Sequence, residues 1–170
     1  LSIRRQRQMC IRDSPLSIQK INLKKRPKII HQSGEKHFQA LKATYKKCGI
    51  KADCRAYLDN IEKVYEWADL VIARSGALTV SEFSVAGISS ILVPFPFAVD
   101  NHQFYNARYL SDKKAARLIN QEELTTELLS GLLQDITRSK CLNMAKAALE
   151  NTATKPEEVI YQACERLIKK

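Results

Sequence analysis

The chain has 170 residues, an apolar content of 45% and a formal net charge of +10. Its length suits one domain with a substantial core, and its apolar content argues against intrinsic disorder. No stretch approaches the roughly 20 apolar residues of a membrane-spanning helix, and the first residues lack the apolar middle of a secretory signal. Any membrane association is therefore expected to be peripheral.

The positive charge is concentrated near the start of the sequence. Residues 1–28 hold nine Lys or Arg and one Asp, whereas the other 142 residues hold 19 basic and 17 acidic side chains. Such a run is typical of a solvated tail, so we expect no nucleic-acid partner. Residues 1–15 also resemble the peptide translated from sequencing-adaptor DNA. We therefore expect residues 1–26 to be a non-native or disordered head and residues 27–170 to form the domain.

The five cysteines are scattered, and no pair has the spacing of a zinc knuckle. We expect free thiols of a reducing compartment. No pair of carboxylates is placed to hold a metal ion, so neither a metal nor another cofactor is predicted. The cysteines are Cys10, Cys48, Cys54, Cys141 and Cys164.

From residue 27 onward, expected strands alternate with expected helices. Strands are expected within 27–32, 51–58, 69–73, 89–95 and 115–120. Helices are expected within 35–49, 59–68, 77–87, 101–113, 122–136, 138–152 and 156–170, the second of them capped by Asp59. Short strands rich in Val, Ile and Leu that are joined through helices predict an α/β fold with a doubly wound, Rossmann-like parallel sheet.

Ligands of such sheets bind beyond the carboxyl ends of the strands, where the strand order reverses. Four places in the sequence follow those ends, and they are where function is expected. They are Ser33-Gly34, Leu58-Asp59, Ser75-Gly76 and the loop 94–103.

The segment from Ser75 to Thr79 combines a strand end, a glycine and the start of a helix. The first N–H groups of a helix lack partners within it and favour an anion such as a phosphate. An ordinary strand-to-helix turn with a serine cap is the alternative. Glu82 lies about one and two-thirds turns beyond Gly76. Its carboxylate can accept both ribose hydroxyls, although a surface glutamate that compensates the helix dipole is also consistent. Together these features predict a nucleotide cradle.

Four segments resemble the C-terminal domain of the MurG-type N-acetylglucosaminyltransferases, and the likeness runs from about residue 27 to the end. They read RSGALTVSEFSVAG, HQSG, YLDNIEKVYEWADLVIARSG and VPFPFAVDNHQFYNA. The resemblance implies the donor-binding half of a two-domain GT-B enzyme. Such enzymes transfer GlcNAc from UDP-GlcNAc to lipid-linked MurNAc-pentapeptide, with inversion, at the cytoplasmic face of the bacterial membrane during peptidoglycan synthesis.

The resemblance also implies roles for particular residues. Glu82 would bind the ribose, the backbone of Leu58 would recognise uracil, and Gln103 would contact the GlcNAc hydroxyls. His102 stands where some members carry a glutamine. His31 and His37 are interpreted as structural. The implied UDP-GlcNAc-binding set is Leu58, Ser75, Gly76, Ala77, Leu78, Thr79, Val80, Ser81, Glu82, His102 and Gln103.

The acceptor-binding N-terminal domain of that family has no counterpart in this sequence, nor has the general base that lies there. The strand and Gly-Gly-Ser turn that open the C-terminal domain also have no match. We therefore expect no catalytic residue in this chain, weak UDP binding and no transfer, with the acceptor and the membrane surface engaged through the missing domain. The alternatives are a stand-alone UDP-GlcNAc-binding subunit with a separate membrane-anchored acceptor subunit, and a UDP-GlcNAc 2-epimerase-like enzyme, against which the quoted motifs argue.

Overall fold

The computed structural model describes residues 2–4, 9–150, 161, 164 and 165, with side chains from residue 13 onward. The strands of this part are β1 (Ser2–Arg4), β2 (Ile30–Gln32), β3 (Asp53–Arg55), β4 (Val71–Ala73), β5 (Ser90–Leu92) and β6 (Ala116–Leu118). Its α-helices are α1 (Met9–Gln19), α2 (Glu35–Lys47), α3 (Ile61–Trp67), α4 (Ala77–Ala86), α5 (His102–Ser111), α6 (Thr126–Asp135) and α7 (Arg138–Glu150). Short 3₁₀ turns are η1 (Leu23–Lys25) and η2 (Val99–Asn101).

The strands form one parallel sheet in the order β3-β2-β1-β4-β5-β6. The chain winds outward from β1 to β3 and then, from β4, outward in the other direction. This order confirms the predicted doubly wound sheet and places its switch point between β1 and β4. A ligand crevice is therefore expected beside the carboxyl ends of these two strands.

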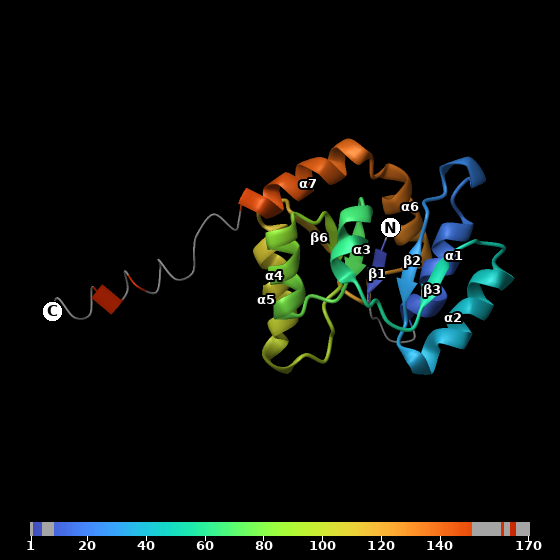
Figure 1. Cartoon of the computed structure of the whole chain (residues 1–170), viewed down its shortest axis with the longest axis horizontal. Coiled ribbons are helices and arrows are strands. Elements are labelled where there is room, and N and C mark those ends of the chain that lie inside the picture. The colour runs from blue at the N-terminus through green and yellow to red at the C-terminus, as the bar shows by residue number, and fades with distance from the viewer. Residues whose placement is uncertain (1, 5–8, 151–160, 162–163, 166–170) are drawn as a thin grey trace.

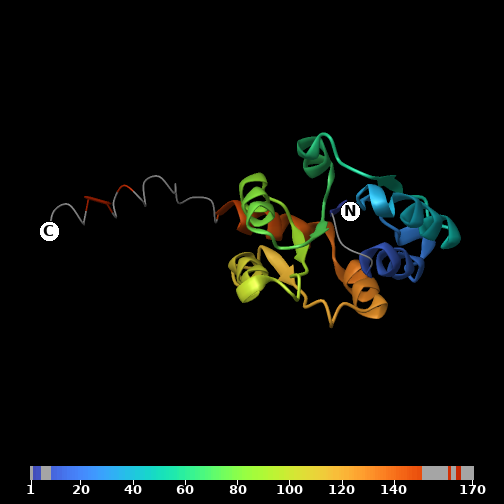
Figure 2. The same cartoon turned by 90° about the horizontal axis from the view of Figure 1, so that it is seen from below.

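Helices cover both faces of the sheet (Figures 1 and 2). Successive strand residues point to opposite faces, so Ile72 of β4 packs into the core beneath α1, α2 and α6. Its neighbours Val71 and Ala73 pack into the core beneath α3, α4 and α5. Helix α7 runs along the upper side of Figure 1, from α6 to α4, and contributes Cys141 to the first core and Ala148 to the second. The sheet and α7 thus contribute side chains to both cores.

The helix ends follow local chemistry. The Asn60 side-chain oxygen accepts a hydrogen bond from Lys63 N at 3.3 Å, so α3 is capped by Asn60 and the predicted cap at Asp59 was wrong by one residue. Gly87 ends α4 with φ of 63°, a left-handed conformation that glycine adopts without strain. The helix predicted at 156–170 falls almost entirely outside the described residues.

The expectation of a head separate from the domain differs from the structure. Strand β1 pairs with both β2 and β4, so the opening strand predicted to be missing has a counterpart. Helix α1 packs against α2 and α6, and Ile18 and Ile21 are buried. Arg26 donates to the carbonyl oxygens of Ile21 and Gln19 at 3.0 and 2.8 Å. Burial of these apolar groups holds the segment 13–26 on the folded domain. The non-native origin suggested for it stays a prediction.

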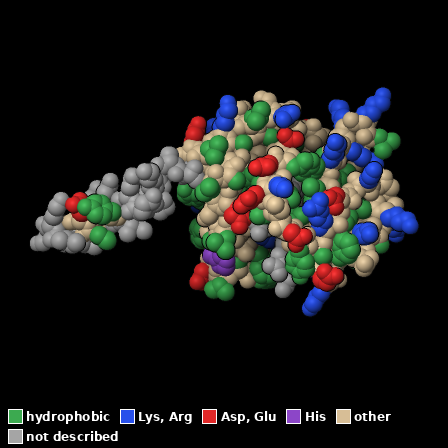
Figure 3. Space-filling view, viewed as in Figure 1, with side chains coloured by type: hydrophobic (Ala, Val, Ile, Leu, Met, Phe, Trp, Pro, Cys, Tyr) green, Lys and Arg blue, Asp and Glu red, His purple; other side chains and the backbone are tan. Residues whose placement is uncertain are grey.

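The basic charge therefore belongs partly to the surface of the fold. Lys24 and Lys25 are exposed on the connection between α1 and β2, and basic side chains gather on the right of Figure 3. Cysteines 48, 54, 141 and 164 are free, as predicted. Among the described residues, no helix is both long enough and apolar enough to cross a membrane.

Candidate functional site

The predicted site segments follow the carboxyl ends of neighbouring strands. Gly34, with φ of 77°, leads from β2 into α2, and its N–H donates to Ala56 O at 3.0 Å. The N–H of Ser33 donates to Arg55 O at 3.1 Å. These bonds tie the ends of β2 and β3 together. In Figure 1 the start of α2 and the loop before α5 both lie at the lower side of the molecule.

Ser75 fixes the turn after β4 to helix α5. Its side chain is fully buried and donates to Gln103 O at 2.7 Å. The side-chain amide of Asn106 donates to Ser75 O at 3.1 Å. Ser75 therefore does not cap α4, which rules out the alternative of a serine-capped turn. Its buried side chain thus anchors the turn to α5.

The first turn of α4 begins at Gly76 without a side-chain cap. The first bond of the helix runs from Val80 N to Gly76 O at 3.0 Å, so the N–H groups of Ala77, Leu78 and Thr79 lie at the open helix end. Gly76 has an ordinary φ of −61°, and an added Cβ would meet only Thr79 Oγ1, at 3.9 Å. The turn thus does not require glycine.

Side chains of α4 point in several directions. Val80 is buried in the core, whereas Ser81 is exposed and Leu78 is 80% exposed. Leu78 and Thr79 precede Glu82 by four and three residues, so these three share one face of the helix. The structure thus groups Leu78, Thr79 and Glu82 and places the Val80 side chain elsewhere.

Glu82 is half-buried and faces α3. Its Oε2 accepts a hydrogen bond from the Tyr65 hydroxyl at 2.7 Å. The Tyr65 ring packs edge-on against Phe83, with centroids 5.6 Å apart. This environment differs from that of a solvated glutamate that only compensates a helix dipole. The sequence marks Glu82 as the lone acid of its helix but gives no sign of the contact with Tyr65.

The loop after β5 is held at several points. Gln103 Oε1 accepts from Phe95 N at 3.0 Å. Arg74 donates to Val93 O at 3.2 Å and to Pro94 O at 2.7 Å, and its guanidinium lies 5.5 Å from the centre of the Phe95 ring. Sequence reasoning missed Arg74, although its position between a buried strand and Ser75 marks it as lying at the same edge.

His102 is exposed at the start of α5. Its Nδ1 lies 2.7 Å from Val99 O, a contact that requires a proton on Nδ1. In the neutral ring, Nε2 is then an acceptor. The preceding residues Asp100 and Asn101 have φ of 50° and 53°, so the chain turns sharply into the helix. Gln103 is half-buried beside it.

Leu58 lies in the loop between β3 and α3 and is half-buried. The strand predicted over 51–58 extended too far, because β3 ends at Arg55 and the chain bends at Ala56. Leu58 precedes the Asn60 cap of α3 by two residues. Helix α3 therefore connects this loop to the tyrosine that contacts Glu82.

His31 is a core residue, as predicted. Its Nδ1 lies 3.0 Å from the Tyr45 hydroxyl, and burial lowers the pKa of His31 from 6.5 to about 3. His37 is half-buried on α2. No cluster of metal-ligating side chains is present in the part of the chain with described coordinates.

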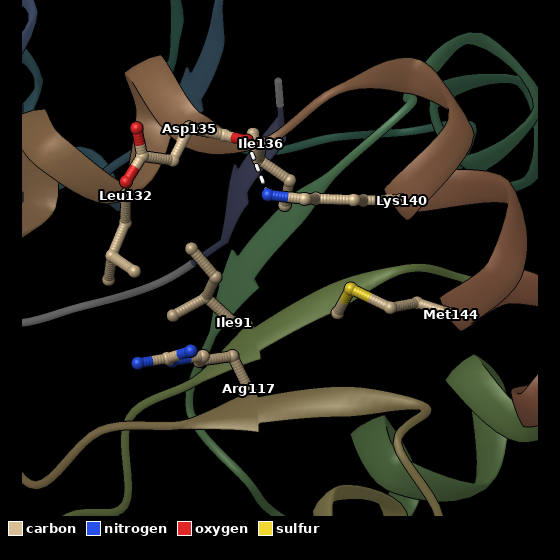
Figure 4. A pocket seen from close by; sticks show the side chains of 7 residues that line it. All are labelled: Ile91, Arg117, Leu132, Asp135, Ile136, Lys140 and Met144. Atoms are coloured by element: carbon tan, nitrogen blue, oxygen red, sulfur yellow. Dashed lines mark hydrogen bonds between the residues drawn. The ribbon is translucent and has the colours of Figure 1, made fainter.

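A separate hollow of about 270 Å³ lies between the sheet and helices α6 and α7. Figure 4 shows Ile91 and Met144 in it, with Lys140 donating to Asp135 O at 2.9 Å. None of the predicted site residues lines it. The site considered below is therefore the carboxyl edge of the sheet.

Comparison with known proteins places this arrangement among glycosyltransferases. Residues 10–161 match the model of the glycosyltransferase family 28 C-terminal domain. A protein of Azoarcus sp. named UDP-N-acetylglucosamine–N-acetylmuramyl-(pentapeptide) pyrophosphoryl-undecaprenol N-acetylglucosamine transferase is 42% identical over 153 residues, which are 90% of this chain and 43% of that protein. A protein of the same name from Dechloromonas aromatica is 45% identical over 84% of this chain and 40% of its own length.

Solved structures agree. The crystal structure of Acinetobacter baumannii MurG superposes with a TM-score of 0.81 and 31% identity over 88% of this chain and 46% of that chain. A glycosyltransferase of kitacinnamycin, at 12% identity and a TM-score of 0.57, shares the fold alone. This chain thus spans less than half the length of the proteins that it resembles.

Proposed function

Since the chain belongs to the glycosyltransferase family 28 C-terminal domain, we propose that it binds UDP-GlcNAc at the carboxyl edge of its sheet. One observation carries the proposal: the open N-terminus of α4 and the carboxylate of Glu82 lie on one helix, on a shared face, beside the switch point of a doubly wound sheet. That arrangement pairs an anion site with an acceptor for hydroxyls, which is what a nucleoside diphosphate requires.

Each part of the ligand has a proposed partner. The diphosphate accepts hydrogen bonds from the N–H groups of Ala77, Leu78 and Thr79, with favourable interaction from the helix dipole. The ribose hydroxyls donate to Glu82. A carboxylate offers about four lone-pair positions, so the hydrogen bond from Tyr65 is compatible with this role.

The two ends of the ligand extend to opposite sides of α4. The uracil contacts the backbone at Leu58, in the loop before α3. The sugar lies toward the start of α5, where Gln103 and His102 supply polar groups. Since Gln103 Oε1 already accepts from Phe95 N, a sugar oxygen would be met by the Gln103 Nε2 as donor. The second ring nitrogen of His102, Nε2, would accept from a hydroxyl when the ring is neutral.

We propose that the whole protein transfers GlcNAc from this donor to a lipid-linked muramyl-pentapeptide, as the names of its relatives state for them. The leaving UDP would be stabilised by the same amides that bind the diphosphate. In the relatives this region is one part of a longer chain, which favours the donor half of an enzyme over a stand-alone binding subunit. An acceptor with an undecaprenol chain also favours peripheral attachment to the membrane surface.

The test is a calorimetric titration of the chain with UDP, ADP and GDP. We expect a preference for UDP, because the backbone at Leu58 selects the base, and about ten-fold weaker UDP binding by Glu82→Ala, because a hydrogen bond to a charged group contributes about 1.5 kcal/mol or more. Glu150→Ala, at the far end of α7, is the matched control and should bind UDP like the wild type.

Two results would contradict the proposal. Equal affinity for the three nucleotides would contradict the proposed uracil contact at Leu58. Unchanged UDP affinity in Glu82→Ala would contradict the proposed ribose contact, on which the proposal depends.

A further inference from the structure

We infer that Tyr65 is a positioning residue for nucleotide recognition, whose hydroxyl holds the Glu82 carboxylate where it meets the ribose. The inference rests on the proposed function and assigns to α3 a part in recognition. The contact is a hydrogen bond of 2.7 Å from the Tyr65 hydroxyl to Glu82 Oε2. It joins two helices through residues that are 17 positions apart.

The tyrosine ring has a fixed position. Tyr65 is 8% exposed, and its ring meets that of the fully buried Phe83 at an interplanar angle of 83°. An edge-on pair of this kind is favoured by the ring quadrupoles. Because the core holds the ring, the hydroxyl at its tip is presented to α4 at one place. A glutamate with three rotatable bonds is thereby given an anchor.

The anchor matters for binding because Glu82 otherwise loses conformational freedom when the ligand arrives. Ordering a flexible side chain opposes association, and a side chain already held in its bound conformation avoids that cost. A hydrogen bond to an ionised carboxylate is also among the stronger ones in proteins. Tyr65 therefore contributes to affinity without touching the nucleotide.

Helix α3 links this anchor to the base-binding loop. The helix begins at its cap Asn60, two residues after Leu58, and carries Tyr65 in its second turn. The loop proposed to read uracil and the group that orients the ribose acceptor thus belong to one short unit. Base contact and ribose contact are expected to act together, since a shift of α3 moves both.

The experiment compares UDP with 2′-deoxy-UDP on the wild type and on Tyr65→Phe, which keeps the packed ring and removes the hydroxyl. We expect about five-fold weaker binding of UDP and a smaller loss for 2′-deoxy-UDP, which keeps only one of the two hydroxyls, so that the preference for the ribose falls. Tyr109→Phe removes a hydroxyl from α5 and should change neither affinity.

A double-mutant cycle separates positioning from a general effect on the fold. In a Glu82→Ala background, Tyr65→Phe should have no further effect on the preference for UDP over 2′-deoxy-UDP. A second measurement compares the wild type with Glu82→Gln, both labelled with ¹³C-tyrosine. The Cζ resonance of Tyr65 should differ between the two proteins. This comparison keeps the inference testable if Tyr65→Phe does not fold.

The outcomes are distinct. An unchanged preference in a folded Tyr65→Phe variant, together with a clear loss in Glu82→Ala, overturns this inference and leaves the proposed function standing. A Tyr65 Cζ resonance that does not respond to Glu82→Gln also overturns it. Failure of the wild type to bind UDP overturns the proposed function and this inference with it.

Discussion

At the scale of single residues, His31 shows how burial sets a protonation state. The residue lies on β2 against Tyr45, with ring centroids 5.7 Å apart, and is fully buried. Because burial disfavours the charged imidazolium, the pKa is about 3 in the folded chain, against 6.5 as the ordinary value. The unfolded chain therefore binds a proton at a pH where the folded chain does not.

The stability of the fold should therefore depend on pH through His31. Above pH 6.5 the histidine is neutral in both the folded and the unfolded chain, so it adds no pH dependence. As the pH falls from 6.5 toward 3, only the unfolded chain takes up the proton, and the folded state loses stability. Between about pH 7.5 and 5.5, this histidine should lower the free energy of unfolding by about 1.4 kcal/mol. Urea denaturation at the two pH values measures the change. His31→Gln should lose this contribution, whereas His37→Gln should retain it; an equal slope in both variants would refute the assignment.

At the scale of elements, the end of α4 depends on α7. Gly87 combines φ of 63° with close packing, since an added Cβ would lie 2.7 Å from Leu149 Cγ and 2.9 Å from Leu149 Cδ1. Gly131, within α6, has no atom within 4 Å of such a Cβ. A methyl group added by the same substitution therefore meets a crowded site at Gly87 and open space at Gly131.

Gly87→Ala should destabilise the chain by about 1–3 kcal/mol, because it adds backbone strain and displaces α7. Gly131→Ala should stabilise it by about 0.5–1 kcal/mol, because alanine is the better helix former. Thermal and urea unfolding of both variants measure the difference. If Gly87→Ala were neutral, the packing of α4 on α7 described above would be incorrect.

Elements were more predictable than their contacts. The alternation of apolar runs with helical spacing indicated β2 through β6 and α2 through α7, but it lengthened the strands, because residues that flank a three-residue ladder are apolar too. Helix α1 went unrecognised, since Pro15 and the charged residues Arg12 and Asp13 interrupt its pattern. Glu82 stood out as a lone acid, whereas the Tyr65 contact depends on how α3 crosses α4, which no local pattern encodes.

At the scale of the whole molecule, the sheet is the common wall of two cores. Strand β1 lies at its centre, paired with β2 on one side and β4 on the other. Without it, two inner strands would become edges with unpaired backbone groups, and such edges promote association between chains.

Deletion of residues 1–8 should therefore lower the midpoint of urea unfolding and produce oligomers. Size-exclusion chromatography detects the association, and hydrogen exchange should show faster exchange of the backbone amides of β2 and β4. A monomeric deletion variant with an unchanged midpoint would show that β1 is dispensable, as the expectation of a non-native head would have it.

The double attachment of Ser75 to α5 has a consequence for the choice of donor. Since its hydroxyl and its carbonyl oxygen are both bonded to that helix, the proposed diphosphate site at the start of α4 is held at a fixed distance from the proposed sugar site at the start of α5. If the proposed sites are correct, this distance selects the length of the linker between nucleoside and sugar. A donor with one phosphate fewer, such as a nucleoside monophosphate sugar, is expected to bind more weakly than a diphosphate donor.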